Sequence, residues 1–203
     1  MRDEMNVSIF TPTHDTKFLQ EAYDSIKGQD FHEWIVVYNN GAVPIDFKDP
    51  RVKQSTLTVA PEWVGPLKAY ACEQATGDVL LELDHDDLLA PDCIEEVKKA
   101  FADPKVGFVY SNNIHCAADM SKVPRYDVSF GWEYREVEFQ GNRLDEFNAF
   151  DPTPNSVSRI WFAPDHVRSF RRDVYDKVGG YNKKMRVLDD LDLMCRMYEV
   201  CLF

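Results

Sequence analysis

Short apolar runs alternate with amphipathic segments through the first half of the chain. Residues 6–13 (NVSIFTPT) form one apolar run, and Phe18, Ala22 and Ile26 in the next segment recur at intervals of four. A short continuous run is typical of a buried strand, whereas a four-residue spacing is typical of a helix. The pattern therefore predicts a strand and then a helix over 15–29, with Asp15 as its N-cap.

The same alternation continues to about residue 113. Gly77 marks the end of a second helix, and Pro91 lies near the start of a third. Alternating strands and helices predict an α/β fold with a mostly parallel central sheet covered by helices. The further elements predicted are strands over 33–41, 51–59, 78–84 and 106–112, and helices over 65–77 and 90–104.

The second half of the chain lacks this rhythm. Residues 114–159 are polar and aromatic with no clear period, which predicts a smaller region of irregular strands and loops. Regular patterns return over 166–182 and in a closing helix over 188–200. We expect a single domain over 1–203, divided into halves at 1–113 and 114–203.

Composition limits the classes of partner. The chain has 203 residues, 44% of them hydrophobic, and a net charge of -12. Nucleic-acid binding needs a basic surface, so the charge argues against a nucleic-acid partner. An anionic substrate would need a bound metal or a few placed Lys and Arg side chains.

The cysteines and the hydropathy of the chain indicate its cellular compartment. Five widely spaced cysteines form no CxxC pair, which predicts free thiols in a reducing compartment, the cytoplasm. The N-terminus lacks the apolar stretch of a signal peptide, and no apolar run approaches the ~20 residues of a membrane span. Peripheral attachment to a membrane through a partner stays open.

The segment DVLLELDHDDLLAP (78–91) carries the strongest chemical signal. Asp84, Asp86 and Asp87 lie close together directly after an apolar run, and their charges repel unless a cation lies between them. If the strand continued, Asp84 and Asp86 would lie on the same side of an extended backbone. Such a pair can hold manganese or magnesium. The alternatives are that Asp86 or Asp87 caps the next helix, and that His85 packs or hydrogen-bonds rather than binding a metal.

Polar clusters follow three of the predicted strands. They are TPTHD (11–15), YNNG (38–41) and DHDD (84–87). In open α/β sheets ligands bind beyond the carboxyl ends of the strands, so we expect one pocket to receive all three clusters.

Three segments together resemble the inverting family 2 glycosyltransferases of GT-A fold. They are SIFTPTHDTKFLQEAYDSIKGQ, ATGDVLLELDHDDLLAP, and RRDVYDKVGGYN followed by LDDLDLMCR. The resemblance spans nearly the whole chain in the right order. It implies a Rossmann-like half over 1–113 that binds a nucleotide-sugar donor, and an acceptor and catalytic-base half over 114–203.

The resemblance also implies roles for individual residues. Asp190 falls on the catalytic base of the family, and Asp86 on the residue that binds the metal carrying the diphosphate. Taken alone, Asp189, Asp190 and Asp192 are also explained as acids that favour the start of a helix, with Asp192 paired to Arg196. The expected donor-binding residues are Pro12, His14, Asn39, Lys68, Asp84 and His85, and the expected acceptor-side residues are His166 and Arg171.

The sequence departs from the family pattern in two places. Asn39-Asn40 replaces the usual Asp-Asp, so uridine is the first choice of base but thymidine, cytidine and guanosine stay open. The chain also ends at YEVCLF, where family members usually continue. We expect either a truncation or a minimal enzyme whose acceptor side is completed by a partner protein or another copy.

The resulting prediction is a metal-assisted inverting transfer from a UDP-sugar to a hydroxyl acceptor such as a carbohydrate, as in polysaccharide biosynthesis. Two alternatives come from other classes. A sugar nucleotidyltransferase would need a Gly-rich phosphate loop, and TPTHDT contains no glycine. A non-catalytic module that binds nucleotide sugars would explain Asn39 and Asn40, but it would not need Asp84, Asp86 and Asp190 together.

Overall fold

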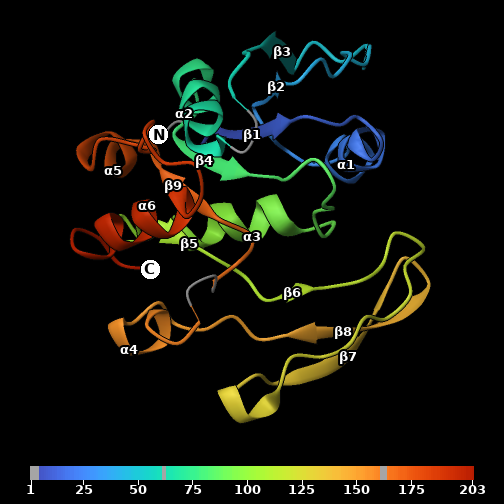
Figure 1. Cartoon of the computed structure of the whole chain (residues 1–203), viewed down its shortest axis with the longest axis vertical. Helices are drawn as coiled ribbons and strands as arrows, with labels where there is room; N and C mark the ends of the chain where they lie inside the picture. Colours follow the sequence, from blue (N-terminus) through green and yellow to red (C-terminus); the bar gives the residue numbers. More distant parts are fainter. Residues whose placement is uncertain (1–4, 61–62, 161–163) are drawn as a thin grey trace. The chain divides into compact units, whose positions relative to one another are not determined.

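The structure, a computed structural model, describes residues 5–60, 63–160 and 164–203 (Figure 1). It contains two compact units. The first comprises Met1–Val109 and Ser169–Phe203, and the second comprises Tyr110–Arg168.

A six-stranded sheet forms the centre of the first unit (Figure 1). β1 pairs in parallel with β2 and β4, and β2 pairs in parallel with β3, whereas β9 runs antiparallel to β4 and β5. The predicted α/β fold with a mostly parallel sheet is therefore confirmed. In spatial order the strands are β3 (Val52–Thr56), β2 (Glu33–Tyr38), β1 (Val7–Thr13), β4 (Val79–Glu82), β9 (Ser169–Arg171) and β5 (Phe108–Val109).

The central strands are buried along their whole length. Every residue of β1, β2 and β4 is buried, as expected for parallel strands with both faces covered. Their continuous apolar runs reflect this burial. The edge strand β3 has no buried residue, and Lys53, Gln54 and Thr56 are exposed.

Within the described residues of the first unit there are five helices. They are α1 (Leu19–Ile26), α2 (Val64–Gln74), α3 (Cys93–Ala100), α5 (Arg172–Lys177) and α6 (Asp189–Tyr198). α2 packs on β1 and β2 and also contacts α6. In α1 the four-residue pattern faces the core, because Ala22 and Ile26 are fully buried.

The predicted start of α1 is wrong. The helix begins at Leu19, and no side chain caps it. Asp15 instead accepts a hydrogen bond from the N–H of Lys17, 3.0 Å away, in a local turn that ends β1. Such turns compete with helix capping for Asp side chains.

The compact units differ from the predicted halves at 1–113 and 114–203. β9 inserts between β4 and β5, so residues 169–203, including α6, fold with the N-terminal segment. The division into donor and acceptor halves therefore does not follow the physical units. β9 is only three residues long, which is why the sequence pattern did not separate it from α5.

The second unit is built on a small antiparallel sheet of order β6-β8-β7. Trp132, Phe147 and Ile160 form its core. The predicted irregular region therefore includes a regular hairpin, β7–β8, whose turn residues Gln140 and Gly141 both have positive φ. Its elements are β6 (Asn113–Ile114), η1 (Val128–Phe130), β7 (Tyr134–Phe139), β8 (Asn142–Phe147) and α4 (Pro154–Val157).

All five cysteines are free thiols, as predicted. Among the residues that the structure describes, every helix is too short or too polar to cross a bilayer.

Candidate functional site

The predicted polar clusters meet at one edge of the six-stranded sheet. β1, β2 and β4 are parallel, with Thr13 opposite Tyr38 and Phe10 opposite Glu82, so their carboxyl ends lie together. We call this the carboxyl edge. It is the edge at which open α/β sheets bind ligands.

Direct contacts join the segments that follow these strands. The rings of His14 and His85 pack edge to face with centroids 4.9 Å apart. The N–H of Asn39 donates to the carbonyl of Thr13, 2.8 Å away. Pro12 is buried in β1, opposite Val37 of β2. Four of the predicted donor-binding residues are therefore neighbours.

Asn39 is held firmly at the end of β2. Its side chain is buried, and its Oδ1 accepts a hydrogen bond from the N–H of Val59, 3.1 Å away. Asn40 follows with a φ of 53°, a left-handed conformation that asparagine tolerates better than most residues. The two asparagines thus form the turn that ends β2.

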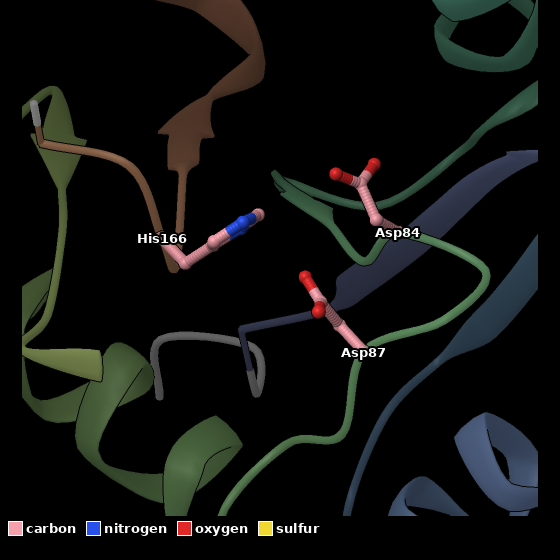
Figure 2. A group of neighbouring side chains, drawn as sticks. All are labelled: Asp84, Asp87 and His166. Carbon is pink, nitrogen blue, oxygen red and sulfur yellow. The ribbon is translucent and has the colours of Figure 1, made fainter. Parts of the chain in front are cut away.

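The acidic segment after β4 is a turn and not an extended strand. The N–H of Asp87 donates to the carbonyl of Asp84, 3.2 Å away. The expected extended backbone is therefore wrong, because the turn pairs Asp84 with Asp87 instead of with Asp86. Carboxylate oxygens of Asp84 and Asp87 lie within 4.8 Å of each other (Figure 2). Asp86 is exposed, with Oδ1 3.9 Å from Nδ1 of His85.

This turn fits a divalent cation. Neither Asp86 nor Asp87 caps the next helix, since α3 begins at Cys93 with Asp92 in the cap position. Asp84 and Asp87 are half-buried carboxylates whose oxygens are close enough to share one hard cation such as Mg²⁺ or Mn²⁺. The arrangement agrees with the predicted metal chemistry, whereas the assignment of Asp86 as the metal residue stays a prediction.

Lys68 lies in a buried ionic cluster at the same edge. Its Nζ is 2.7 Å from Oε1 of Glu82 and 3.2 Å from Oδ2 of Asp189. The hydroxyl of Tyr181 donates to Oε2 of Glu82, 2.8 Å away. All four side chains are buried. The cluster thus links α2, β4, the turn after α5 and the start of α6.

The sequence pattern did not predict this cluster, although one residue pointed to it. Glu82 stands inside the apolar run DVLLELD, and a buried carboxylate needs a cation or hydrogen-bond donors. The partners could not be read from the pattern, because Lys68, Tyr181 and Asp189 come from three other segments.

Asp189 and Asp190 have different environments in the first turn of α6. Burial raises the pKa of Asp189, and the nearby Lys68 only partly offsets this effect. Asp190 is half-buried, and its Oδ1 accepts a hydrogen bond from the N–H of Leu191, 2.8 Å away. The ionic cluster brings Asp190 to the carboxyl edge, since Glu82 is two residues from Asp84 and Asp189 adjoins Asp190.

The other predicted residues lie elsewhere. Arg171 is opposite Val79, the first residue of β4, so it lies at the amino end of β4 and not at the carboxyl edge. Its guanidinium donates to the carbonyls of Val106 and Asp103, at 2.7 and 3.0 Å. This place does not fit an acceptor-side role. His166, which Figure 2 also labels, belongs to the second unit. Its acceptor-side role stays a prediction.

Residues 65–179, more than half of the chain, match the sequence profile of the family described as Glycosyl transferase family 2. No curated protein matches the sequence significantly.

Several solved structures share the fold. A structure of residues 1–349 of S. aureus TarS is 18% identical, with a TM-score of 0.62 over 97% of this chain and 56% of that chain. The same TarS segment was also solved with UDP and with UDP-GlcNAc. The mannosyltransferase PcManGT from Pyrobaculum calidifontis, solved with GDP-Man and Mn²⁺, is 17% identical, with a TM-score of 0.59 over 97% and 52%. The chain therefore spans about half the length of the TarS segment and of PcManGT, and 33% of a longer TarS chain that was also solved.

Proposed function

Because the chain belongs to glycosyl transferase family 2, we propose that it transfers a sugar from a nucleotide-diphosphate donor to a hydroxyl acceptor. One observation carries this proposal. The acidic turn at Asp84–Asp87 and the helix start at Asp190 come from distant parts of the sequence, and Lys68 links their neighbours, because it pairs with Glu82 and with Asp189. A leaving-group site and a base are the two groups that such a displacement needs.

UDP-sugar is the proposed donor. The TarS structures with UDP and UDP-GlcNAc support a uridine nucleotide, although PcManGT binds GDP-Man. Pro12, His14 and Asn39, which follow or end neighbouring strands at the carboxyl edge, are the proposed base-binding residues. The side-chain amide of Asn39 can donate or accept a hydrogen bond, whereas a carboxylate can only accept. Asparagine should therefore discriminate uracil from other bases less strongly than aspartate would.

The acidic turn is the proposed metal site. Asp84 and Asp87 offer two close carboxylate oxygens, and exposed Asp86 lies on the same turn. When bound, a Mn²⁺ or Mg²⁺ ion neutralises the negative charge of the leaving diphosphate. A bound divalent cation would also offset the mutual repulsion of the three carboxylates in this short segment.

Asp190 is the proposed general base. Its carboxylate would accept the proton of the attacking hydroxyl while the sugar–oxygen bond forms on the face opposite the leaving group, which gives inversion. Asp189 is a poor candidate for this role, because it is buried against Lys68. Asp192 is also a poor candidate for the base, because it forms an ion pair with Arg196 at 2.6 Å.

A non-catalytic module is the second candidate, and Asn39-Asn40 in place of two acids is the observation that favours it. It predicts donor binding without turnover.

A thermal-shift screen tests the proposed function. UDP-GlcNAc, UDP-glucose, GDP-mannose and CDP-glucose are each added with and without manganese, and the melting temperature is measured. A ligand that binds only the folded state must raise it. We expect the UDP-sugars to give the largest shifts, and only with manganese. No shift with any nucleotide sugar would contradict the proposal.

A further inference from the structure

We propose that Lys68 is a positioning residue, which fixes the first turn of α6 and through it the carboxylate of Asp190. The inference rests on the proposed function, because it assigns Lys68 to the base instead of to the donor diphosphate. Three features of the first unit carry it: the ionic cluster, the uncapped start of α6 and the close approach of α2 to the segment before α6.

The ionic cluster places one cation between two carboxylates. Lys68 is 5% exposed, and its ammonium lies within 3.2 Å of both Glu82 and Asp189. Breaking a buried ion pair by removing one partner is costly, since it leaves an uncompensated buried charge. Without Lys68 two buried carboxylates would face each other, and the one on α6 could move away only by displacing the helix start.

The start of α6 has no side-chain cap of its own. Leu188 occupies the cap position with a φ of 62°, a conformation that is uncommon for a bulky residue. Leucine offers no side-chain acceptor for the free N–H groups of the turn, so the cap position gives no hydrogen bond, and within the turn Oδ1 of Asp190 accepts one from the N–H of Leu191. Asp189 is the first helical residue, so its ion pair with Lys68 anchors the turn that carries Asp190.

α2 approaches the segment before α6 closely. A Cβ added at Gly65 would lie 2.7 Å from the carbonyl oxygen of Asn182 and 3.1 Å from that of Met185. Lys68 is three residues further along α2, on the same face of the helix as Gly65. The backbone contact at Gly65 and the ion pair at Lys68 therefore hold the same segment at two points.

This arrangement links Lys68 to turnover and not to donor binding. A general base acts only within hydrogen-bond reach of the proton it removes, and a displacement of about 1 Å can cost about a hundredfold in rate. Loss of Lys68 should therefore lower kcat through Asp190 while the donor pocket at His14, Asn39 and the acidic turn is kept.

The experiment compares Lys68→Met, Asp189→Asn and the double variant. UDP release from a UDP-sugar gives kcat, and calorimetry with UDP and manganese gives donor affinity. We expect Lys68→Met to lower kcat by about tenfold or more, with UDP affinity within about twofold of the wild type. The double variant should recover part of that loss. Lys68→Met leaves the carboxylates of Glu82 and Asp189 without the cation between them, and Asp189→Asn removes one of these two charges. If Lys68→Met does not fold, Asp189→Asn alone, which leaves Lys68 paired with Glu82, should lower kcat several-fold and leave UDP affinity unchanged.

Lys53→Met is the matched control. Lys53 also pairs with a buried carboxylate, Glu33, but at the amino end of β2 and away from the carboxyl edge. The variant Lys53→Met should leave both kcat and UDP affinity unchanged.

Two results would overturn the inference alone. The first is a Lys68→Met protein whose UDP affinity falls more than tenfold while kcat is kept, which would make Lys68 a donor ligand. The second is a double variant that is no faster than Lys68→Met. A wild-type protein that binds nucleotide sugars but releases no UDP would instead overturn the proposed function, and this inference with it.

Discussion

The rings of His14 and His85 pack edge to face, with their centroids 4.9 Å apart and their planes at 72°. His14 follows β1 and His85 follows β4, so this contact joins two polar clusters through residues that are 71 positions apart in the sequence. It agrees with the expectation that His85 packs, and it places the acidic turn beside the end of β1. The proposed donor pocket is built around this junction.

The first prediction concerns the acidic turn. Asp86→Asn should abolish the manganese-dependent rise in melting temperature given by UDP, because one charged metal ligand is lost while the fold is kept. Asp87→Asn should weaken it as well, since Asp87 shares the turn with Asp84. Asp92→Asn removes an exposed acid from the nearby start of α3 and should have no effect. Unchanged manganese dependence in Asp86→Asn would refute the assignment of Asp86.

The second prediction uses Asn39. Asn39→Asp should increase the preference for UDP over CDP, because a carboxylate can only accept a hydrogen bond and uracil N3–H can donate one. The hydrogen bond from the N–H of Val59 is kept, so the turn should stay intact. Competition calorimetry with the two nucleotides measures the preference. Asn40→Asp, which adds the same charge at an exposed position, is the control. If the preference does not move, Asn39 lies outside the base pocket.

Much of the fold could be predicted from the sequence, because local patterns determine it. The runs in β1, β2 and β4 are apolar since both faces of the sheet are covered, and Ala22 and Ile26 face the core as their spacing implies. The hairpin β7–β8 was missed, because its strands are half-exposed and mix charges with aromatics. Gln140-Gly141, between two alternating segments, was the turn signal available.

The site could be predicted from the sequence only where polar residues directly follow a strand. The clusters after β1, β2 and β4 meet as expected, since the parallel order of the sheet requires it. The pairing of Asp84 with Asp87, and of Lys68 with Glu82 and Asp189, depends on a turn geometry and on tertiary contacts. No spacing in one segment encodes such contacts.

The third prediction concerns the dependence of stability on pH. Burial alone would raise the pKa of Glu33, but hydrogen bonds from Lys53, Ser8 and Thr76 outweigh it and hold the pKa at about 2. A carboxyl whose pKa is lowered by folding stabilises the protein above its unfolded value, near 4.5, and this contribution is lost as the pH falls toward 2. Between pH 6 and pH 3.5 the loss from this one group is on the order of 1 kcal/mol.

Urea unfolding of the wild type and of Glu33→Gln at the two pH values measures this contribution. Glutamine does not titrate, so between pH 6 and pH 3.5 the free energy of unfolding of Glu33→Gln should fall less than that of the wild type, by a difference on the order of 1 kcal/mol. Equal losses in the two proteins would show that folding does not lower the pKa of Glu33.

The most direct test of the proposed mechanism is the rate of UDP release by Asp190→Asn, with UDP affinity measured on the same protein. Asparagine keeps the size of the side chain and its hydrogen bond from Leu191 but removes its basicity. Turnover should fall by about a hundredfold or more, the scale of general-base catalysis, while UDP binds with nearly unchanged affinity. Asp192→Asn, on the same helical turn, should turn over almost normally. Normal turnover by Asp190→Asn would contradict the account.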